Sequence, residues 1–137
     1  MRITFLLFPN LTQLDFTGPL QVLSRLPGAE VALAAKTKAP VPTDTALTIN
    51  PTHHFTDCPP TDLLCIPGGF GIDDAMQDQG TIAFVKREGA RANYVTSVCT
   101  GAFILGAAGL LEGKKATTHW AYHDHLKAVG AEPVKAR

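Results

Sequence analysis

Short apolar runs, each closed by a turn signal, constrain the fold of this chain more than any other feature. One run covers residues 3–8 and ends at Pro9, and another lies within a predicted buried strand over residues 62–66 and ends at Pro67 with two glycines. Strands with one wet face alternate apolar and polar residues, whereas a short continuous apolar run predicts a strand that is buried on both faces. Such strands are typical of parallel sheets that helices cover on each side.

Helical segments separate the predicted strands. The other predicted strands occupy residues 30–35, 46–49, 94–98 and a short segment after Gly113. The predicted helices occupy residues 14–26, 79–90, 100–108 and 121–129. Pro19 predicts that the regular part of the first helix begins there, since proline fits best in a first turn, and residues 37–45 predict a loop. This alternation indicates a doubly wound α/β fold, with a mostly parallel sheet and helices on both faces.

The length and the charge balance narrow the functional classes. A chain of 137 residues predicts a single domain over residues 1–137. The 12 Lys and Arg residues balance the 12 Asp and Glu residues, so the net charge supplies no attraction to phosphate backbones or anionic lipids. We therefore expect neither a nucleic-acid partner nor a membrane partner.

The N-terminal run and the cysteines predict a cytoplasmic location. The run over residues 3–8 is too short for a secretory signal or a membrane span, because Pro9 stops it and polar residues follow at once. The 3 cysteines are odd in number and show no C-x-x-C spacing. This pattern disfavours a disulfide framework and a structural zinc site, and it favours free thiols in a reducing compartment.

Chemically notable residues follow three of the predicted strands. They are Asp15 after the first strand, Gly68 and Gly69 after the second apolar run, and Cys99 after the strand over residues 94–98. In doubly wound sheets, ligands bind outside the carboxyl ends of the strands. We therefore expect the functional site where these strand ends meet.

Cys99 stands where a nucleophile elbow would present its side chain. Residues 97–101 (SVCTG) join an apolar strand to a helix, with small residues two positions before and after the cysteine. The N–H groups and the dipole of the following helix are expected to stabilise a thiolate and lower the pKa of the thiol. The spacing alone leaves two interpretations open, a catalytic nucleophile or a small core residue. Cys65, inside a predicted strand, is assigned to the core, and Cys58, in a loop, receives no role.

Three further residues are candidates to assist Cys99. The backbone amides of Gly69 and Thr100 would form an oxyanion hole, although a glycine pair after a strand also fits a plain tight turn. Asp15 has the spacing from Thr12 of a capping box, which would make its role structural. Held beside Cys99, the same carboxyl would have its pKa raised by a neighbouring thiolate and would be able to hold and pass a proton.

Histidines cluster toward the C-terminal end, at His119, His123 and His125. The first two have the i, i+4 spacing of a helical metal pair, but Trp120 stands where the H-E-x-x-H motif requires glutamate. We therefore expect no metal and assign the histidines to core or surface positions. One alternative stays open, in which His119 serves Cys99 as general base.

Several motifs, in their order along the chain, resemble the DJ-1/PfpI superfamily. The resemblance rests on residues 8–10 (FPN), 14–19 (LDFTGP), 66–69 (IPGG), 98–102 (VCTGA) and 118–120 (THW). Within the superfamily the chain most resembles the isonitrile hydratases. Membership implies a flavodoxin-like fold, a cysteine at the nucleophile elbow and, commonly, a homodimer.

Three departures from relatives refine this resemblance. Thr100 follows the cysteine where the PfpI-type proteases carry histidine, which argues against peptidase activity. Asp15 stands where DJ-1 carries glutamate and where the isonitrile hydratases resemble this chain in carrying aspartate. Family members usually continue beyond the position of Arg137 with another strand and further helices, so we expect that this chain lacks the C-terminal part of the domain.

The resemblance implies hydration of an isocyanide to an N-substituted formamide through a covalent thioimidate. Cys99 is then expected to attack the terminal carbon while Asp15 handles the proton, without a metal or an organic cofactor. The amides of Gly69 and Thr100 are expected to stabilise charge, and the Thr100 hydroxyl to orient water or the thiol. Two alternatives stay open: a glyoxalase-like or deglycase-like enzyme for small aldehydes, and the sensor domain of an AraC-type transcription regulator.

Overall fold

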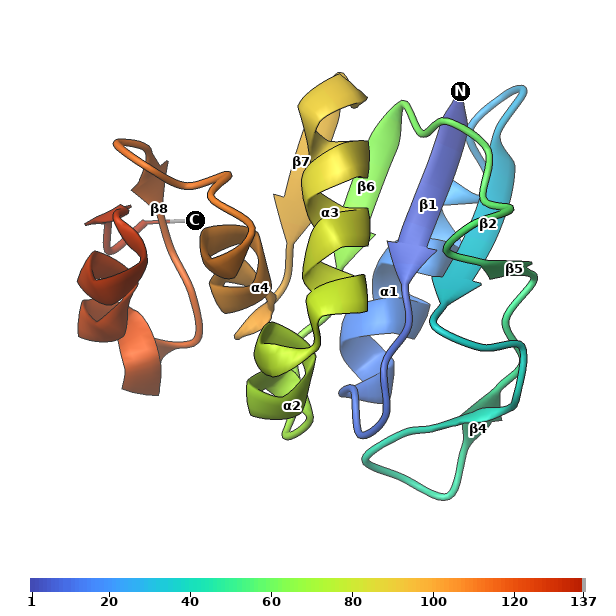
Figure 1. Ribbon diagram of the computed structural model, residues 1–137, viewed down its shortest axis with the longest axis horizontal. Helices are drawn as coiled ribbons and strands as arrows, with labels where there is room; N and C mark the ends of the chain where they lie inside the picture. Colours follow the sequence, from blue (N-terminus) through green and yellow to red (C-terminus); the bar gives the residue numbers. More distant parts are fainter. Residues whose placement is uncertain (137) are drawn as a thin grey trace.

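A five-stranded sheet forms the centre of the molecule, with its strands in the order β5-β2-β1-β6-β7 (Figure 1). The computed structural model describes residues 1–136. The strands of this sheet are β1 (Arg2–Leu6), β2 (Glu30–Ala35), β5 (His53–His54), β6 (Leu63–Ile66) and β7 (Tyr94–Ser97). Each neighbouring pair runs parallel, which confirms the sheet type predicted from the sequence.

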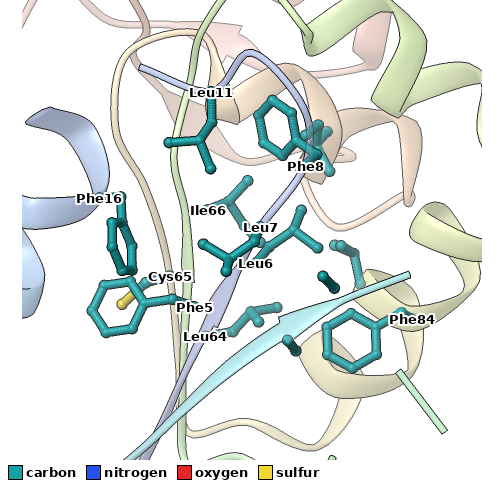
Figure 2. Close-up of a cluster of buried hydrophobic side chains, with 14 of the residues drawn as sticks. Phe5, Leu6, Leu7, Phe8, Leu11, Phe16, Leu64, Cys65, Ile66 and Phe84 are labelled. Carbon is teal, nitrogen blue, oxygen red and sulfur yellow. The ribbon is translucent and has the colours of Figure 1, made fainter. Parts of the chain in front are cut away.

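Helices cover both faces of the sheet. They are α1 (Gln13–Leu23), α2 (Ile72–Gln77), α3 (Gln79–Arg91) and α4 (Gly101–Ala107). On one face, the ring of Phe16 from α1 packs edge-on against Phe5 of β1, with the ring centroids 5.5 Å apart. On the other face, Phe84 of α3 stacks on Phe55 with the centroids 4.4 Å apart. Figure 2 shows Phe16 and Phe84 on either side of the strands, so the predicted doubly wound α/β arrangement is confirmed.

Burial explains why the apolar runs form the inner strands. Ile3, Phe5 and Leu6 of β1, and Leu64 and Ile66 of β6, are at most 1% exposed. Burying a large apolar side chain contributes roughly 1.5–3 kcal/mol, so these adjacent strands are anchored firmly along their length. The loops at their carboxyl ends therefore start from a rigid base.

The first helix, α1, begins earlier than the sequence predicts. It starts at Gln13, whose N–H donates to a carboxylate oxygen of Asp44 at 2.8 Å, and Pro19 lies inside it. Proline has no N–H, so the carbonyl of Asp15 loses its usual helical donor. The prediction that the regular helix begins at Pro19 is therefore wrong. A side chain distant in sequence caps the first turn, and local sequence does not reveal that contact.

The remaining differences concern short elements. In place of the predicted loop and longer strand, β3 (Val41–Pro42) pairs antiparallel with β4 (Thr48–Ile49). The short strand predicted after Gly113 is confirmed as β8 (Lys115–Ala116), and it pairs with the unpredicted β9 (Glu132–Pro133). The last predicted α-helix is instead a 3₁₀ helix, η1 (Trp120–Val129). Over residues 1–136, no helix combines the length and the apolar character needed to cross a bilayer.

Candidate active site

The chain turns sharply between β7 and α4, and Cys99 occupies the turn. Its φ of 54° lies in the left-handed region, which costs a non-glycine residue about 1–2 kcal/mol. Two hydrogen bonds of 3.0 Å fix the turn, from the N–H of Val98 to the carbonyl of Ile66 and from the N–H of Gly101 to the carbonyl of Val98. A strained backbone conformation of this kind is kept only where neighbouring contacts hold it in place, and such conformations are often found at functional sites. The strand-turn-helix geometry predicted around Cys99 is present.

Two glycines let the elbow lie directly against the end of β6. A Cβ atom on Gly101 would come within 2.5 Å of the carbonyl oxygen of Ile66. A Cβ atom on Gly68 would come within 2.7 Å of the backbone nitrogen of Thr100. Both approaches are to backbone atoms, which cannot move aside as a flexible side chain can. The ends of β6 and β7 therefore meet beside Cys99 only because these positions lack side chains.

The amides of the turn after β6 hold two side chains around Cys99. The N–H of Gly68 donates to Oδ2 of Asp15 at 3.2 Å. The N–H of Gly69 donates to Oγ1 of Thr100 at 3.1 Å. One turn thus fixes a carboxyl from α1 and a hydroxyl from the elbow. The Gly69 N–H is already used in this hydrogen bond to Thr100. It is therefore not free to donate directly to an oxyanion, which is the role that the sequence predicts for it.

The Asp15 carboxyl turns toward the elbow although it lies in the first turn of α1. Within residues 1–136 the Thr12 side chain makes no capping hydrogen bond, so the capping-box interpretation is wrong. Burial raises the pKa of Asp15, while its hydrogen bonds with the Gly68 amide and the Cys99 thiol oppose the shift. The expectation of a raised pKa is confirmed, but its main cause is burial and not the charge of a thiolate.

Burial also raises the pKa of the Cys99 thiol above its ordinary value. The hydrogen bond from the Thr100 N–H lowers this pKa, and the charge of Asp15 raises it. The expectation of a lowered thiol pKa is wrong in its net direction, because burial outweighs the donors at the helix N-terminus. The raised pKa favours the protonated thiol, and the Asp15 carboxyl lies beside it.

The thiol opens onto a cavity of about 610 Å³. Of the residues singled out from the sequence, Gly69, Cys99, Thr100, His119 and His125 line this cavity. The remaining wall is largely apolar, with side chains from α2, α4 and η1 that include Met76, Phe103 and Val129. Tyr122 and His125 of η1 add polar groups. A cavity of this size and lining suits a small, mostly apolar organic molecule.

His119 and His123 lie in different surroundings, the first at the N-cap of η1 and the second within it. Residues of a 3₁₀ helix repeat every three positions, so the i, i+4 spacing of His119 and His123 does not place them on one face of η1. Both ring nitrogens of His123 are buried without a hydrogen-bond partner among residues 1–136, whereas His119 lines the cavity. Within the same described range, no cluster of three His, Cys, Asp or Glu side chains is placed to hold a metal ion.

Thr118 contributes to the site although the sequence interpretation assigns it no role. Its Oγ1 donates to the carbonyl oxygen of Cys99 at 2.8 Å. This hydrogen bond ties the segment before η1 to the elbow and brings the adjacent His119 into the cavity wall. The sequence feature that could have identified this residue was a threonine hydroxyl directly before His119 in the T-T-H-W segment. Phe70, which is 91% exposed and also lines the cavity, had no signal in the sequence pattern.

Comparison with known proteins relates the chain to one family. The model of the DJ-1/PfpI family matches residues 1–137. The isonitrile hydratase of Pseudomonas putida is 54% identical over 137 residues, which are 100% of this chain and 60% of that protein. The crystal structure of a ThiJ/PfpI family protein from Pseudomonas syringae superimposes with a TM-score of 0.96 at 46% identity, over 99% of this chain and 57% of that chain. A deglycase of Thermococcus kodakarensis is 28% identical over 138 residues, which cover 99% of this chain and 82% of the deglycase.

Proposed function

This chain belongs to the DJ-1/PfpI family, and we propose that it hydrates isocyanides to N-substituted formamides with Cys99 as the nucleophile. The observation that carries the proposal is a thiol in a strained elbow beside the half-buried carboxyl of Asp15, which the Gly68 N–H holds at 3.2 Å and whose pKa is raised. The 54% identity to an isonitrile hydratase supports the choice of reaction. This chain covers 60% of the length of that hydratase. The proposal therefore rests on the arrangement of this chain's own residues as well as on the identity.

The first step joins the Cys99 sulfur to the terminal carbon of the isocyanide. The thiol proton passes to the Asp15 carboxylate as the sulfur attacks, and Asp15 then gives this proton to the same carbon. The product is a covalent thioimidate whose mass exceeds that of the enzyme by one isocyanide. A raised carboxyl pKa suits this role, because it narrows the gap between the acidities of the two groups that exchange the proton.

The second step hydrolyses the thioimidate. Water loses a proton to Asp15 and adds to the imidate carbon, and Asp15 passes the proton to the substrate nitrogen. The carbon–sulfur bond then breaks, the hydroxyl proton returns through Asp15 to the sulfur of Cys99, and the formamide leaves. The isocyanide and one water supply every atom of the product, so the proposed reaction needs no further co-substrate.

Thr100 contributes its amide and its hydroxyl to these steps. Its N–H donates a hydrogen bond to the Cys99 sulfur and lowers the pKa of the thiol, so it stabilises negative charge when the thiol ionises. Its Oγ1 accepts the hydrogen bond from Gly69, which leaves the hydroxyl hydrogen for the sulfur or the water. Gly69 therefore acts as a positioning residue that fixes the direction of this hydroxyl.

The cavity supports a small uncharged substrate. Met76, Phe103 and Val129 offer apolar contacts, which favour an uncharged substituent against this part of the wall. An isocyanide with an apolar substituent fits this chemistry, because its reacting carbon is also its polar end. The substituent would lie against the apolar wall while the carbon meets Cys99.

We further propose that the active form is a cytoplasmic homodimer. The 3 cysteines are free, which fits a reducing compartment. Leu14 and Val22 of α1 are 65% and 68% exposed, which supplies apolar surface for a second copy of the chain. Light scattering of the purified protein should give a mass of two chains, and a monomer mass at micromolar concentration would contradict the dimer.

A second enzymatic function is favoured by the 28% identity to a deglycase over 82% of that protein. An enzyme of this kind would use the same thiol and carboxyl on small aldehydes. The sensor interpretation instead predicts that a ligand binds in the cavity without being converted. These alternatives differ in their products, so one assay separates them.

The test is to incubate the protein with butyl isocyanide or with methylglyoxal and to follow the products by mass spectrometry. We expect butylformamide from the wild-type protein, its loss in Cys99→Ala, and no lactate from methylglyoxal. Retained formamide production in Cys99→Ala would contradict the nucleophile. Lactate without formamide would replace the proposed function by the glyoxalase-like one, and binding of the isocyanide without any product would replace it by the sensor function.

A further inference from the structure

His119 uses one ring nitrogen to hold its own backbone. The residue is the N-cap of η1, and its Nδ1 accepts a hydrogen bond from the N–H of Ala121 at 3.2 Å. A nitrogen that accepts this hydrogen bond carries no proton, so the proton of the neutral ring lies on Nε2. The ring therefore offers a donor, and not an acceptor, to a molecule that occupies the cavity.

His119 lies close to the reacting groups of the proposed function. The neighbouring Thr118 donates to the carbonyl of Cys99 at 2.8 Å, and both His119 and Cys99 line the cavity. The ring contacts the rings of Trp120 and Tyr122, with centroid distances of 5.4 and 5.9 Å. These contacts limit the orientations of the imidazole and keep it in the cavity wall.

We infer that His119 is a catalytic residue that donates a hydrogen bond from Nε2 to the substrate nitrogen, in place of acting as the general base for Cys99. The inference rests on the proposed hydration of isocyanides. The thiol already has Asp15 as its proton acceptor, so a second base beside it has no proton to take. The substrate nitrogen, in contrast, has no fixed hydrogen-bond donor among the groups that act on the thiol.

The donor matters most when water adds to the thioimidate. The new carbon–oxygen bond pushes the electrons of the carbon–nitrogen double bond onto nitrogen, which then takes the proton that Asp15 removed from water. A hydrogen bond from Nε2 stabilises the negative charge that develops on nitrogen before the proton arrives. His119 keeps its own proton throughout, so it returns unchanged after each turnover.

Three variants at this position separate a donor from a base. His119→Gln keeps an N–H donor near the place of Nε2, His119→Glu has the same shape but an acceptor in its place, and His119→Leu has neither. We expect His119→Leu and His119→Glu to lose about 10²-fold in kcat, as is typical for removal of one donor to developing charge. We expect His119→Gln to stay within about tenfold of the wild-type kcat.

Intact-mass measurement during turnover provides the second readout. Loss of the donor slows the second step, so His119→Leu and His119→Glu should accumulate the thioimidate, seen as a mass increase of one isocyanide. His53→Leu on β5, at the edge strand of the sheet beyond β2, is the control and should match the wild type in kcat and in adduct level.

The outcomes distinguish this inference from the proposed function itself. If the wild-type protein makes no formamide, the proposed function fails. If the wild type is active and His119→Glu retains more activity than His119→Gln, His119 is a base and the inference is overturned. Wild-type activity in all three variants would also overturn it. The Gln and Glu side chains have the same shape, so a structural effect of the substitution should lower the unfolding temperature of both variants equally. In that case the adduct level of the folded protein, compared between the two variants, decides whether His119 acts as a donor.

Discussion

Cys65 lies inside strand β6 and Cys99 lies just beyond the neighbouring strand β7, and their chemical surroundings differ. Cys65 lies inside β6, is 5% exposed and sits beside Phe5 and Phe16 (Figure 2). Burial raises the pKa of Cys65 to about 11. Cys99 lies just beyond β7, is half-buried, and meets a carboxyl and a hydroxyl at the cavity. The two residues are of the same type, so their different positions along the strands underlie our proposal that Cys99 is the reactive thiol.

The difference follows from what the backbone does at a strand end. Inside a sheet the amides donate to neighbouring strands, and side chains from the covering helices close over each residue. Beyond the strand the ladder stops, and the amides of the next turn become donors for side chains. The Gly68 and Gly69 amides use this freedom to hold Asp15 and Thr100 around Cys99.

The largest expected effect comes from the same substitution at the two cysteines. Cys99→Ser should lower kcat/KM by at least about 10³-fold, because a hydroxyl is a much weaker nucleophile in this setting, while leaving the free energy of unfolding nearly unchanged. Cys65→Ser should leave kcat/KM within about twofold and lower the free energy of unfolding by about 1–3 kcal/mol, because it buries a polar group. Steady-state kinetics and urea unfolding measure the four values. An equal loss of activity in both variants would break the comparison.

Asp15→Asn should show that the setting of Cys99 serves activity at some cost in stability, because the substitution is expected to lower kcat and to raise the free energy of unfolding. Without a proton acceptor for the thiol, kcat should fall by about 10²- to 10⁴-fold. Since the pKa of Asp15 is raised by folding, its ionisation destabilises the folded state as the pH rises from the ordinary carboxyl value through the raised one. The variant avoids that ionisation, so its stability relative to the wild type should increase over this pH range and then level off.

Urea unfolding at several pH values across the acidic-to-neutral range measures this second effect. Asp74→Asn, on the exposed surface of α2, is the matched control for the loss of a carboxylate and should leave kcat unchanged. If the stability of Asp15→Asn relative to the wild type fell as the pH rises, the pKa of Asp15 would be lowered by folding and not raised.

A methyl group added at the strand end should harm the site more than one added on α1. Gly68→Ala would press its Cβ to within 2.7 Å of the Thr100 nitrogen, which should cost about 1–3 kcal/mol of stability. The same shift of the elbow should reduce kcat by up to about 10²-fold. Gly18→Ala has no atom within 4 Å of the new Cβ, so it should stabilise the helix by about 0.5–1 kcal/mol without changing kcat. Unfolding and kinetic measurements on both variants check the contrast, and a Gly68→Ala protein with wild-type kcat would contradict it.

The smallest expected effect concerns backbone strain. Glycine adopts the φ of 54° at position 99 without steric cost, so Cys99→Gly should be more stable than Cys99→Ala by about 1 kcal/mol. At position 65, inside a strand, the order should reverse, with Cys65→Gly less stable than Cys65→Ala by about 0.5–1 kcal/mol. Thermal unfolding of the four variants measures both differences. The same order at both positions would show that the elbow is not strained.

The long elements of the fold were predictable because their patterns are local. The apolar runs identify β1 and β6 and require cover on both faces, which leads directly to a parallel sheet with helices. The start of α1 depends on the contact of Gln13 with Asp44, and β5 has only two residues at the edge of the sheet. Neither feature leaves a periodic signal, because tertiary contacts determine both.

The proximity of the candidate residues was predictable, but the net pKa shift of Cys99 and the contribution of Thr118 were not. Strand ends and glycines predicted that Asp15, Gly69 and Cys99 lie close together, and the structure brings them together in space. The net pKa of Cys99 was missed because it depends on the depth of burial, which the sequence does not specify. Thr118 was missed because its partner is a backbone carbonyl, which any residue type supplies.

The central claim is that the strand-end thiol, and neither buried thiol, forms the covalent intermediate. Rapid mixing of the protein with butyl isocyanide, acid quenching and peptide mass mapping would locate the adduct. The account predicts a mass increase of one isocyanide on the peptide that contains Cys99, appearing before butylformamide and decaying as the formamide accumulates. An adduct on Cys58 or Cys65, or formamide production with no adduct on Cys99 at any time, would contradict it.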